Sequence, residues 1–116
     1  MMNLKGILNK VNNKVLTLLG FAAKAGKLSF GMDMAVTSVK NGKSYLCLAA
    51  NDVSEKSKKE IGFHTLNKNV PFVVLNNETI ETVSKAVGKK CGILSVNDKS
   101  FAESILTIIG GYANDQ

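Results

Sequence analysis

Residues 24–40 hold the residue types and spacings that best fit one kind of chemistry, the binding of an anion. Gly31 follows a short apolar run and precedes a helical pattern, so it would start a helix whose first N–H groups carry roughly half a positive charge. Such a helix end suits a phosphate, and a glycine there lets the backbone come close to a partner. Lys24 and Lys27 precede this turn, and Lys40 follows the helix. We therefore predict that backbone donors and ammonium groups of this stretch meet one anionic surface.

The positive charge of the chain lies in its first half. The net charge is +6, and residues 1–50 hold seven lysines and one acidic residue, whereas residues 51–116 hold eight of each. This asymmetry is typical of a footprint on nucleic acid or on an anionic membrane, although solvated lysines that favour solubility give the same count. All fifteen basic residues are lysine, which lacks the planar fork that reads guanine edges. We predict RNA as the partner, recognised through its backbone and shape.

An enzymatic alternative starts from Asp33, Asp52 and Asp98, each of which follows an apolar run predicted to be a strand. Carboxylates at such positions could hold a magnesium ion for phosphate chemistry, although acids there more often cap helices. A cysteine nucleophile with His64 as its base is a weaker hypothesis, because Cys47 lies inside an apolar run. The glycines match neither a phosphate loop nor a dinucleotide fingerprint. We predict no catalytic activity, no metal and no cofactor.

Apolar residues alternate between helical and strand patterns along the chain. Three-and-four spacing predicts a helix from Leu4 to Ala25 that stops at Gly26. Short apolar runs predict strands, and each is followed by a helical pattern that opens at Gly31 or at a polar residue. The predicted strands are 28–30, 45–50, 72–75 and 93–96, and the helices after them are 32–40, 55–66, 78–87 and 99–109.

Polar residues and glycines mark the expected ends of these helices. The candidate caps are Asp52 with Glu55, or Ser54, for the helix at 55–66, and Asn76 or Asn77 for the helix at 78–87. The pair Gly110–Gly111 would stop the last helix.

The order of one helix and then four strand–helix pairs predicts an α/β fold. We expect a three-layer α/β/α sandwich with a four-stranded mixed sheet and helices on both faces. A length of 116 residues and 45% apolar content fit one domain over residues 1–116. No apolar run approaches the ~18 residues of a membrane span, and the first residues lack the uninterrupted apolar stretch of a signal peptide, so we expect a cytoplasmic protein without membrane contact.

These elements and several sequence stretches resemble the family of kink-turn-binding ribosomal proteins of the seven-Ae and thirty-e kind. The resemblance covers about Val15 to Ile109, and its stretches are AGKLSFG, KNGKSYLCLAANDVS, NVPFVVL and VGKKCGILSVNDKSFA. It implies a sandwich that binds bent RNA, with sheared G·A pairs held by the loop and helix N-terminus around Gly31. The expected partner is ribosomal or other structured RNA, bound by a monomer in association with the ribosome.

The residues after Gly31 depart from the pattern of that family, which is glycine, any residue, asparagine, glutamate, two residues and lysine. This chain has Met32 at the unspecified position and Asp33, Met34 and Thr37 at the three specified positions after the glycine. The resemblance implies that Asp33 replaces a donating amide, that Met34 removes a carboxylate that accepts from guanine, and that Thr37 removes a cation. Each lost contact costs ~1–3 kcal/mol of discrimination, so general RNA affinity would outlast a preference for kink-turns.

Two further segments match loops that face RNA in the family. One contains Asn51 and Asp52, and the other spans residues 88–93. In the second loop, Lys89 and Lys90 stand near positions where relatives bring apolar residues to an extruded base, so charge would replace stacking. If this loop lies near Gly31, it adds a basic rim to the helix end.

A third class of function is an adaptor that binds protein at the ribosome. Its distinguishing feature would be an exposed apolar patch, for which Met32 and Met34 are the candidates. Methionines at helical spacing are more often part of the core.

Overall fold

The predicted order of one helix followed by four strand–helix pairs is confirmed. The computed structural model describes the backbone of residues 4–114 and the side chains of residues 14–110. The helices are α1 (Leu4–Lys24), α2 (Met32–Lys40), α3 (Glu55–Asn67), α4 (Ile80–Val87) and α5 (Lys99–Asn114), and the strands are β1 (Leu28–Phe30), β2 (Leu46–Ala50), β3 (Phe72–Leu75) and β4 (Ile93–Val96). Strand β2 begins one residue later than predicted, after the exposed Tyr45.

The four strands form one mixed sheet in the order β1-β4-β2-β3. Strand β4 runs antiparallel to both of its neighbours, whereas β2 and β3 are parallel. Every residue of β2 and β4 is buried, because these two strands occupy the centre of the sheet and are covered on both faces. The apolar run at 45–50 therefore indicated a buried strand correctly.

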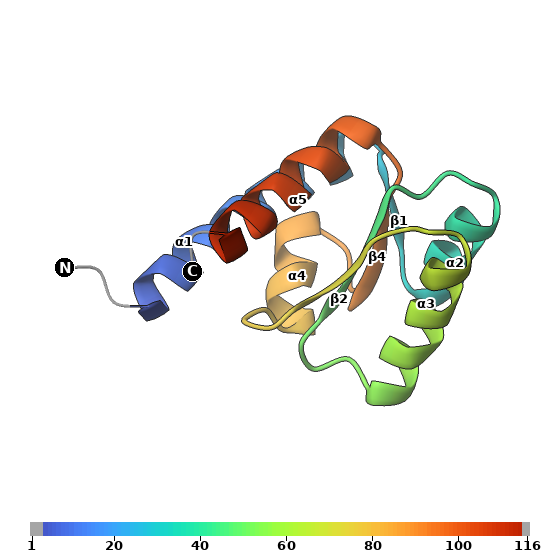
Figure 1. Ribbon diagram of the computed structural model, residues 1–116, viewed down its shortest axis with the longest axis horizontal. Helices are drawn as coiled ribbons and strands as arrows, with labels where there is room; N and C mark the ends of the chain where they lie inside the picture. Colours follow the sequence, from blue (N-terminus) through green and yellow to red (C-terminus); the bar gives the residue numbers. More distant parts are fainter. Residues whose placement is uncertain (1–3, 115–116) are drawn as a thin grey trace.

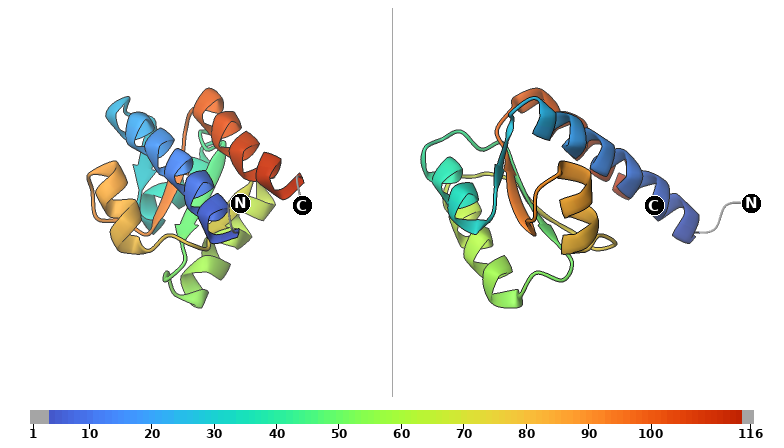
Figure 2. Two further views of the ribbon diagram at one scale, coloured as in Figure 1. Left: turned by 90° about the vertical axis from the view of Figure 1, so that its left-hand side faces the viewer. Right: turned by 180° about the vertical axis from the view of Figure 1, so that it is seen from behind.

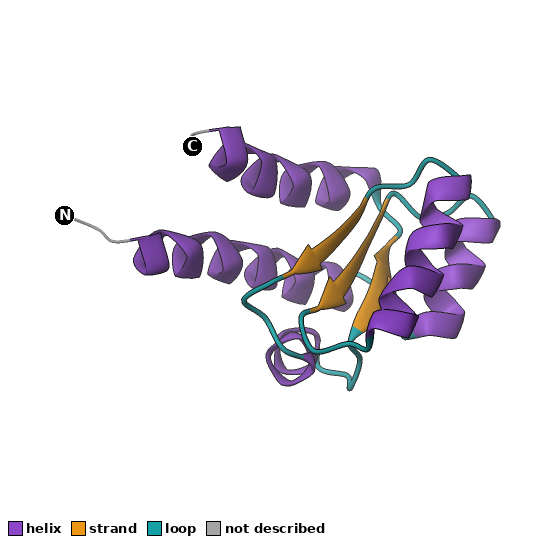
Figure 3. Cartoon of the chain, turned by 60° about the horizontal axis from the view of Figure 1, so that its bottom comes forward, coloured by secondary structure: helices purple, strands orange, loops and turns teal. Residues whose placement is uncertain are grey.

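The helices form two layers on opposite faces of the sheet. Helices α2 and α3 cover one face, and α1, α4 and α5 cover the other (Figures 1 and 3). Helix α1 packs against both α4 and α5, and Figure 2 shows α1 and α5 side by side. The predicted three-layer α/β/α sandwich is thus confirmed.

The first helix follows the predicted apolar spacing where its side chains are described. Val15, Leu19 and Ala22 are almost completely buried and lie on the same side of α1. Gly26 ends the helix with a φ of 72°, a left-handed conformation that glycine adopts without strain. Toward its N-terminus, α1 extends past α4 and the sheet (Figure 1).

Helix α3 has one of its two predicted N-caps, whereas α4 has neither of the caps predicted for it. The Ser54 hydroxyl accepts from the Ser57 N–H at 3.1 Å, whereas α4 is capped by Thr79 and not by Asn76 or Asn77. Thr79 accepts from the Thr82 N–H, and the Thr82 hydroxyl accepts from the Thr79 N–H, which is a capping box. The turn before this cap is fixed because the Glu78 carbonyl accepts from the N–H of Asn51.

The predicted stop at Gly110–Gly111 is wrong, because α5 continues to Asn114. Each glycine in a helix interior costs only about 0.5–1 kcal/mol relative to alanine. The apolar residues of α5 before them pack on the core, with Ile105 completely buried and Ile108 and Ile109 partly buried. Burial of such side chains is worth more than the cost of the glycines.

Between residues 4 and 114, no helix has both the length and the apolar character that crossing a lipid bilayer requires.

Candidate nucleic-acid interface

Four connecting segments meet at one end of the sheet. Strands β1, β2 and β3 finish there and β4 starts there, since Phe30 pairs with Leu94 and Ala49 pairs with Ile93. The segments are Gly31, 51–54, 76–79 and 88–92. We call this the glycine end of the sheet, and the other end the opposite end.

Gly31 links β1 to α2 in a backbone conformation that favours glycine. Its φ is 86°, and a side chain in this region would be strained. The Gly31 N–H donates to the Ile93 carbonyl at 2.8 Å, and its carbonyl accepts from the Ala35 N–H at 3.0 Å. These two hydrogen bonds fix the start of α2 beside the start of β4.

The first turn of α2 differs from those of the three helices that follow it. No side chain caps the N-terminus of α2, whereas Ser54 and Thr79 cap α3 and α4, and an Asp98 oxygen accepts from the Phe101 N–H of α5 at 2.8 Å. The N–H groups at the start of α2 therefore lack the side-chain oxygen that helix N-termini commonly have. An exposed anion could take that place.

The loop at 88–92 brings two lysines to the same end. The Lys89 ammonium lies 5.1 Å from the centre of the Phe30 ring, a distance at which a cation is attracted to an aromatic face. The Ser84 hydroxyl donates to the Cys91 carbonyl and accepts from the Cys91 N–H, which anchors the loop to α4. Lys89 and Lys90 are both exposed. The basic rim expected beside Gly31 is therefore present.

The segment at 51–54 also lies at the glycine end, but its acidic residue has a structural contact. An Asp52 oxygen accepts from the Ile80 N–H at 2.8 Å, so the carboxylate binds the N-terminus of α4, where the helix dipole favours negative charge. The Asn51 carbonyl accepts from the Lys58 ammonium at 2.7 Å. Both Asn51 and Asp52 remain exposed.

The exposed surface at the start of α2 is formed by residues that the sequence singled out. Asp33 and Thr37 are exposed, and the Thr37 hydroxyl donates to the Asp33 carbonyl at 2.9 Å. Met32 packs partly against the core as expected, whereas Met34 is 56% exposed. A core role for both methionines is therefore wrong for Met34.

Lys24, Lys27 and Lys40 lie at the opposite end of β1 and α2 and do not surround the start of α2. Strand β1 separates Lys27 from Gly31 by about 13 Å, the length of four extended residues. Helix α2 places Lys40 about 13 Å from Gly31, nine residues along the helix. Lys24 and Lys40 each occupy the last turn of a helix, where a cation complements the negative end of the helix dipole.

Hydrogen bonds hold these lysine-bearing segments at the opposite end. The Asn97 N–H donates to the Lys27 carbonyl at 2.8 Å, and the Asn97 amide donates to the Ser29 hydroxyl at 2.8 Å. Ser29 is in turn hydrogen-bonded to Ser38 of α2. Sequence spacing did not reveal this arrangement, because it does not show that β1 and α2 both extend from Gly31 to the opposite end of the sheet.

Gly92, whose role at the site had little signal in the sequence, shapes the glycine end. A Cβ on Gly92 would lie 2.7 Å from a methyl carbon of Val53 and 2.8 Å from a side-chain carbon of Ile80, so only glycine lets these segments pack so closely. The run Cys91-Gly92-Ile93 before a buried strand was the only signal for it. Alignment of these segments also depends on the Gly92 carbonyl, which accepts from the Ala50 N–H at 2.8 Å.

Glu78 is a buried carboxylic acid at the glycine end. The residue is 8% exposed, and its Oε2 atom is the one buried side-chain oxygen or nitrogen of the described residues without a hydrogen-bond partner. Burial raises the pKa of the Glu78 carboxyl, and a hydrogen bond with Thr82 opposes part of this rise. Its position directly before Thr79 gave no sign of burial, since glutamate is common in exposed first turns.

The hypothesis of a magnesium site finds no support in this geometry. Asp52 and Asp98 cap helices at opposite ends of the sheet. Within the part of the chain that the structure describes, no three His, Cys, Asp or Glu side chains gather closely enough to hold a metal ion.

Comparison with known proteins decides the family. The sequence model described as "Ribosomal protein L7Ae/L30e/S12e/Gadd45 family" matches residues 13–105. The chain belongs to this family. The L7Ae/L30e/S12e/Gadd45 assignment confirms the resemblance seen in the sequence stretches around Gly31 and in the loop at 88–93.

Two curated relatives carry the same name. The chain is 30% identical over 98 residues to the "RNA-binding protein YlxQ" of Enterococcus faecium, which covers 84% of this chain and 93% of that protein. It is 24% identical over 93 residues to the "RNA-binding protein YlxQ" of Bacillus subtilis, with 79% and 91% covered. The chain is thus similar to YlxQ proteins over most of their length.

Two solved structures have the same fold. A Bacillus halodurans protein described as having unknown function superposes with a TM-score of 0.79 at 28% identity and covers 84% of this chain and 97% of its own. The Giardia lamblia 15.5kD RNA binding protein superposes with a TM-score of 0.70 and covers 90% and 89%. At 16% identity, the second likeness concerns the fold alone.

Proposed function

We propose that this chain is a non-enzymatic RNA-binding protein whose glycine end contacts structured RNA. The observation that carries the proposal is the N-terminus of α2, which no side chain caps, beside the exposed Lys89 and Lys90. Backbone N–H groups at such a helix end and nearby ammonium groups both favour phosphate. Membership of a ribosomal protein family and two relatives named RNA-binding proteins support RNA as the source of that phosphate.

The RNA-contacting residues follow from this placement. Gly31 lets the RNA backbone approach the start of α2, and the exposed side chains of Asp33, Met34 and Thr37 border that approach. The remaining proposed contacts at this end are Met32, Asn51, Asp52, Lys89 and Lys90.

The proposed target is kink-turn-like RNA, which the protein binds with little preference over other structured RNAs. Phosphate contacts position a protein on nucleic acid without reading its sequence, and these are the contacts that α2, Lys89 and Lys90 offer. The side chains that follow Gly31 supply neither a donating amide at Asp33 nor a carboxylate at Met34. Binding should therefore respond strongly to salt and only weakly to the bend of the RNA.

Lys24, Lys27 and Lys40 have a separate part in this proposal. They lie at the opposite end of β1 and α2, so one phosphate cannot meet them and the start of α2 together. Their charge attracts RNA over a distance of about one Debye length, about 8 Å at physiological salt.

The same proposal includes the setting in which the chain acts. We infer a cytoplasmic monomer, one domain over residues 1–116, associated with the ribosome or with other structured RNA. Support for this comes from the ribosomal family to which the chain belongs.

A binding titration tests the proposal. The protein is titrated with a kink-turn RNA and with a straight duplex of equal length, each at 50 and at 200 mM salt. We expect binding of both RNAs that weakens at least tenfold at the higher salt, with a small preference for the kink-turn. Absence of binding to either RNA at low salt would reject RNA binding at the glycine end.

An adaptor that binds protein is the second candidate, because the side chain of Met34 is 56% exposed. An apolar protein contact should change little with ionic strength. The adaptor function would be favoured if neither RNA binds in the titration and if the chain binds a protein partner in a way that salt does not weaken and Met34→Ala abolishes.

A further inference from the structure

The exposed face of α1 carries an aromatic side chain between two lysines. Lys14, Thr17, Phe21 and Lys24 follow each other at intervals of three, four and three residues, and all four are exposed. Such spacing places them in one row along the helix. Phe21 is 56% exposed, so a partner can reach its ring. We call this row the α1 stripe.

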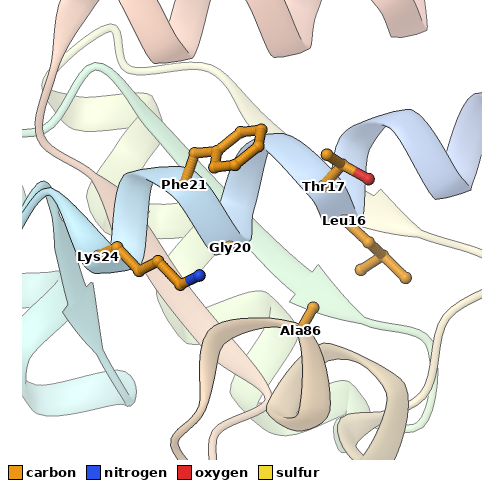
Figure 4. A pocket seen from close by; sticks show the side chains of 6 residues that line it. All are labelled: Leu16, Thr17, Gly20, Phe21, Lys24 and Ala86. Atoms are coloured by element: carbon orange, nitrogen blue, oxygen red, sulfur yellow. The ribbon is translucent and has the colours of Figure 1, made fainter.

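A groove runs beside the α1 stripe, between α1 and α4. It is lined by Leu16, Thr17, Gly20, Phe21, Lys24 and Ala86 (Figure 4). Gly20 allows the close approach of the two helices, since a Cβ there would lie 3.0 Å from the Ala86 carbonyl oxygen. Figure 4 shows Phe21 and Lys24 on consecutive turns at this groove.

The charge around the α1 stripe has one sign. Helix α1 contains no acidic residue. On the two helices that pack against α1, Lys85 pairs with Glu81 of α4 at 3.2 Å and Lys99 pairs with Glu103 of α5 at 3.9 Å, so each of these pairs has no net charge. Phe21 thus lies in a positive field.

A second exposed aromatic, Phe63 on α3, provides a contrast. It is 62% exposed, but α3 mixes lysines with Glu55 and Glu60. A mixed field suits no polyanion in particular. Of these two exposed phenylalanines, therefore, only Phe21 lies on a helix whose charged residues are all lysines.

We propose that the α1 stripe binds single-stranded RNA, with one base stacked on the Phe21 ring and the flanking phosphates near Lys14 and Lys24. Stacking of bases on aromatic side chains beside a row of cations is how proteins hold single strands without reading their sequence. The proposal rests on the proposed function, because the single strand is a tail that leaves the structured RNA bound at the glycine end.

The test compares tailed and blunt forms of one RNA. A kink-turn RNA is prepared with blunt ends and with eight-nucleotide (AC)4 single-stranded tails, and the free (AC)4 strand is the third probe. The variants are Phe21→Ala, Phe21→Leu, which keeps apolar area without a ring, and Phe63→Ala as the matched control. Because Phe21 is exposed, its replacement should leave the thermal unfolding temperature unchanged, which is measured first.

We expect the tails to raise the affinity of the wild-type protein and both Phe21 variants to lose that gain. The loss should be about five- to a hundredfold for tailed RNA, with no change for blunt RNA, and Phe63→Ala should change neither. Equal affinity of Phe21→Ala and wild type for tailed RNA would overturn the proposal.

The two proposals fail in distinguishable ways. Wild-type binding of blunt RNA without any effect of tail or Phe21 would overturn the α1 stripe alone. Binding of the free (AC)4 strand that depends on Phe21, without binding of blunt RNA, would overturn the function proposed for the glycine end alone.

A spectroscopic readout separates stacking from loss of contact area. The chain contains no tryptophan, so Phe21→Trp introduces a single indole at the stripe. Addition of tailed RNA should quench its fluorescence, whereas the indole of the Phe63→Trp control should keep its intensity. Equal quenching of both indoles would contradict stacking at Phe21.

Discussion

The backbone N–H of Gly31 donates to the Ile93 carbonyl oxygen at 2.8 Å. This hydrogen bond joins the start of α2 to the start of β4, although 61 residues of sequence lie between them. It aligns the helix end that no side chain caps with the loop of Lys89 and Lys90. The proposed RNA surface therefore depends on sheet pairing more than on any local motif.

Replacement of Gly92 by alanine should destabilise the protein. Its Cβ would overlap side-chain carbons of Val53 and Ile80 at 2.7 and 2.8 Å, and such overpacking costs about 1–3 kcal/mol. Gly62→Ala is the matched control, because a Cβ there meets the Phe72 ring at 3.7 Å in the interior of α3. That change should stabilise the protein by about 0.5–1 kcal/mol. Urea unfolding measures the stability of both variants. A Gly62→Ala variant that is no more stable than Gly92→Ala would contradict this account.

Glu78 should make stability fall as the pH rises. Burial raises the pKa of its carboxyl in the folded protein above the usual value of 4.5, so folding favours the protonated form. The stabilising contribution is complete below the pKa of the unfolded chain and is lost as the pH rises through the pKa of the folded protein. Glu78→Gln keeps the shape without the charge.

The midpoint of thermal unfolding, measured from pH 4 to pH 8 for wild type and Glu78→Gln, checks this expectation. We expect the advantage of Glu78→Gln to grow as the pH rises and to level off above the pKa of the folded protein. A difference between the two proteins that stays constant over the range would show that the carboxyl does not titrate as described.

Changes after Gly31 should alter RNA binding in two separable ways. Asp33→Asn removes an exposed carboxylate from the first turn of α2 and should raise affinity for all structured RNAs about two- to fivefold. Adding Met34→Glu and Thr37→Lys supplies the carboxylate and cation of the family pattern and should raise the preference for kink-turn over duplex at least tenfold. Parallel titrations with both RNAs measure these effects, and a triple variant without preference would contradict the assignment of these positions.

The sequence predicted the layers and the strands because burial leaves a periodic signal. The run around Cys47 indicated a strand buried on both faces, and the spacing of Val15, Leu19 and Ala22 indicated the inner face of α1. Helix ends were less predictable. Thr79 caps α4 because the turn before it is fixed by a contact with Asn51, which is distant in the sequence.

The composition of the candidate site was predictable only in part for the same reason. Gly31 and Lys89 were recognisable from local sequence, but their proximity depends on the pairing of β1 with β4. The seven lysines of residues 1–50 suggested one surface, yet three of the predicted site lysines, Lys24, Lys27 and Lys40, lie at the opposite end. A count of charges does not show at which end of a strand or helix each lysine lies in the fold.

Two pairs of exposed lysines provide the most direct test of the glycine end. Lys89→Ala with Lys90→Ala removes two charges from the loop at the glycine end, and Lys43→Ala with Lys68→Ala removes two charges from loops at the opposite end. The affinity of each double variant for kink-turn RNA is measured from 50 to 200 mM salt. We expect the Lys89 and Lys90 pair to lower affinity about tenfold and to reduce the salt dependence by about two released ions, with a smaller effect of the control pair. Equal losses from the two pairs would contradict binding of RNA at the glycine end.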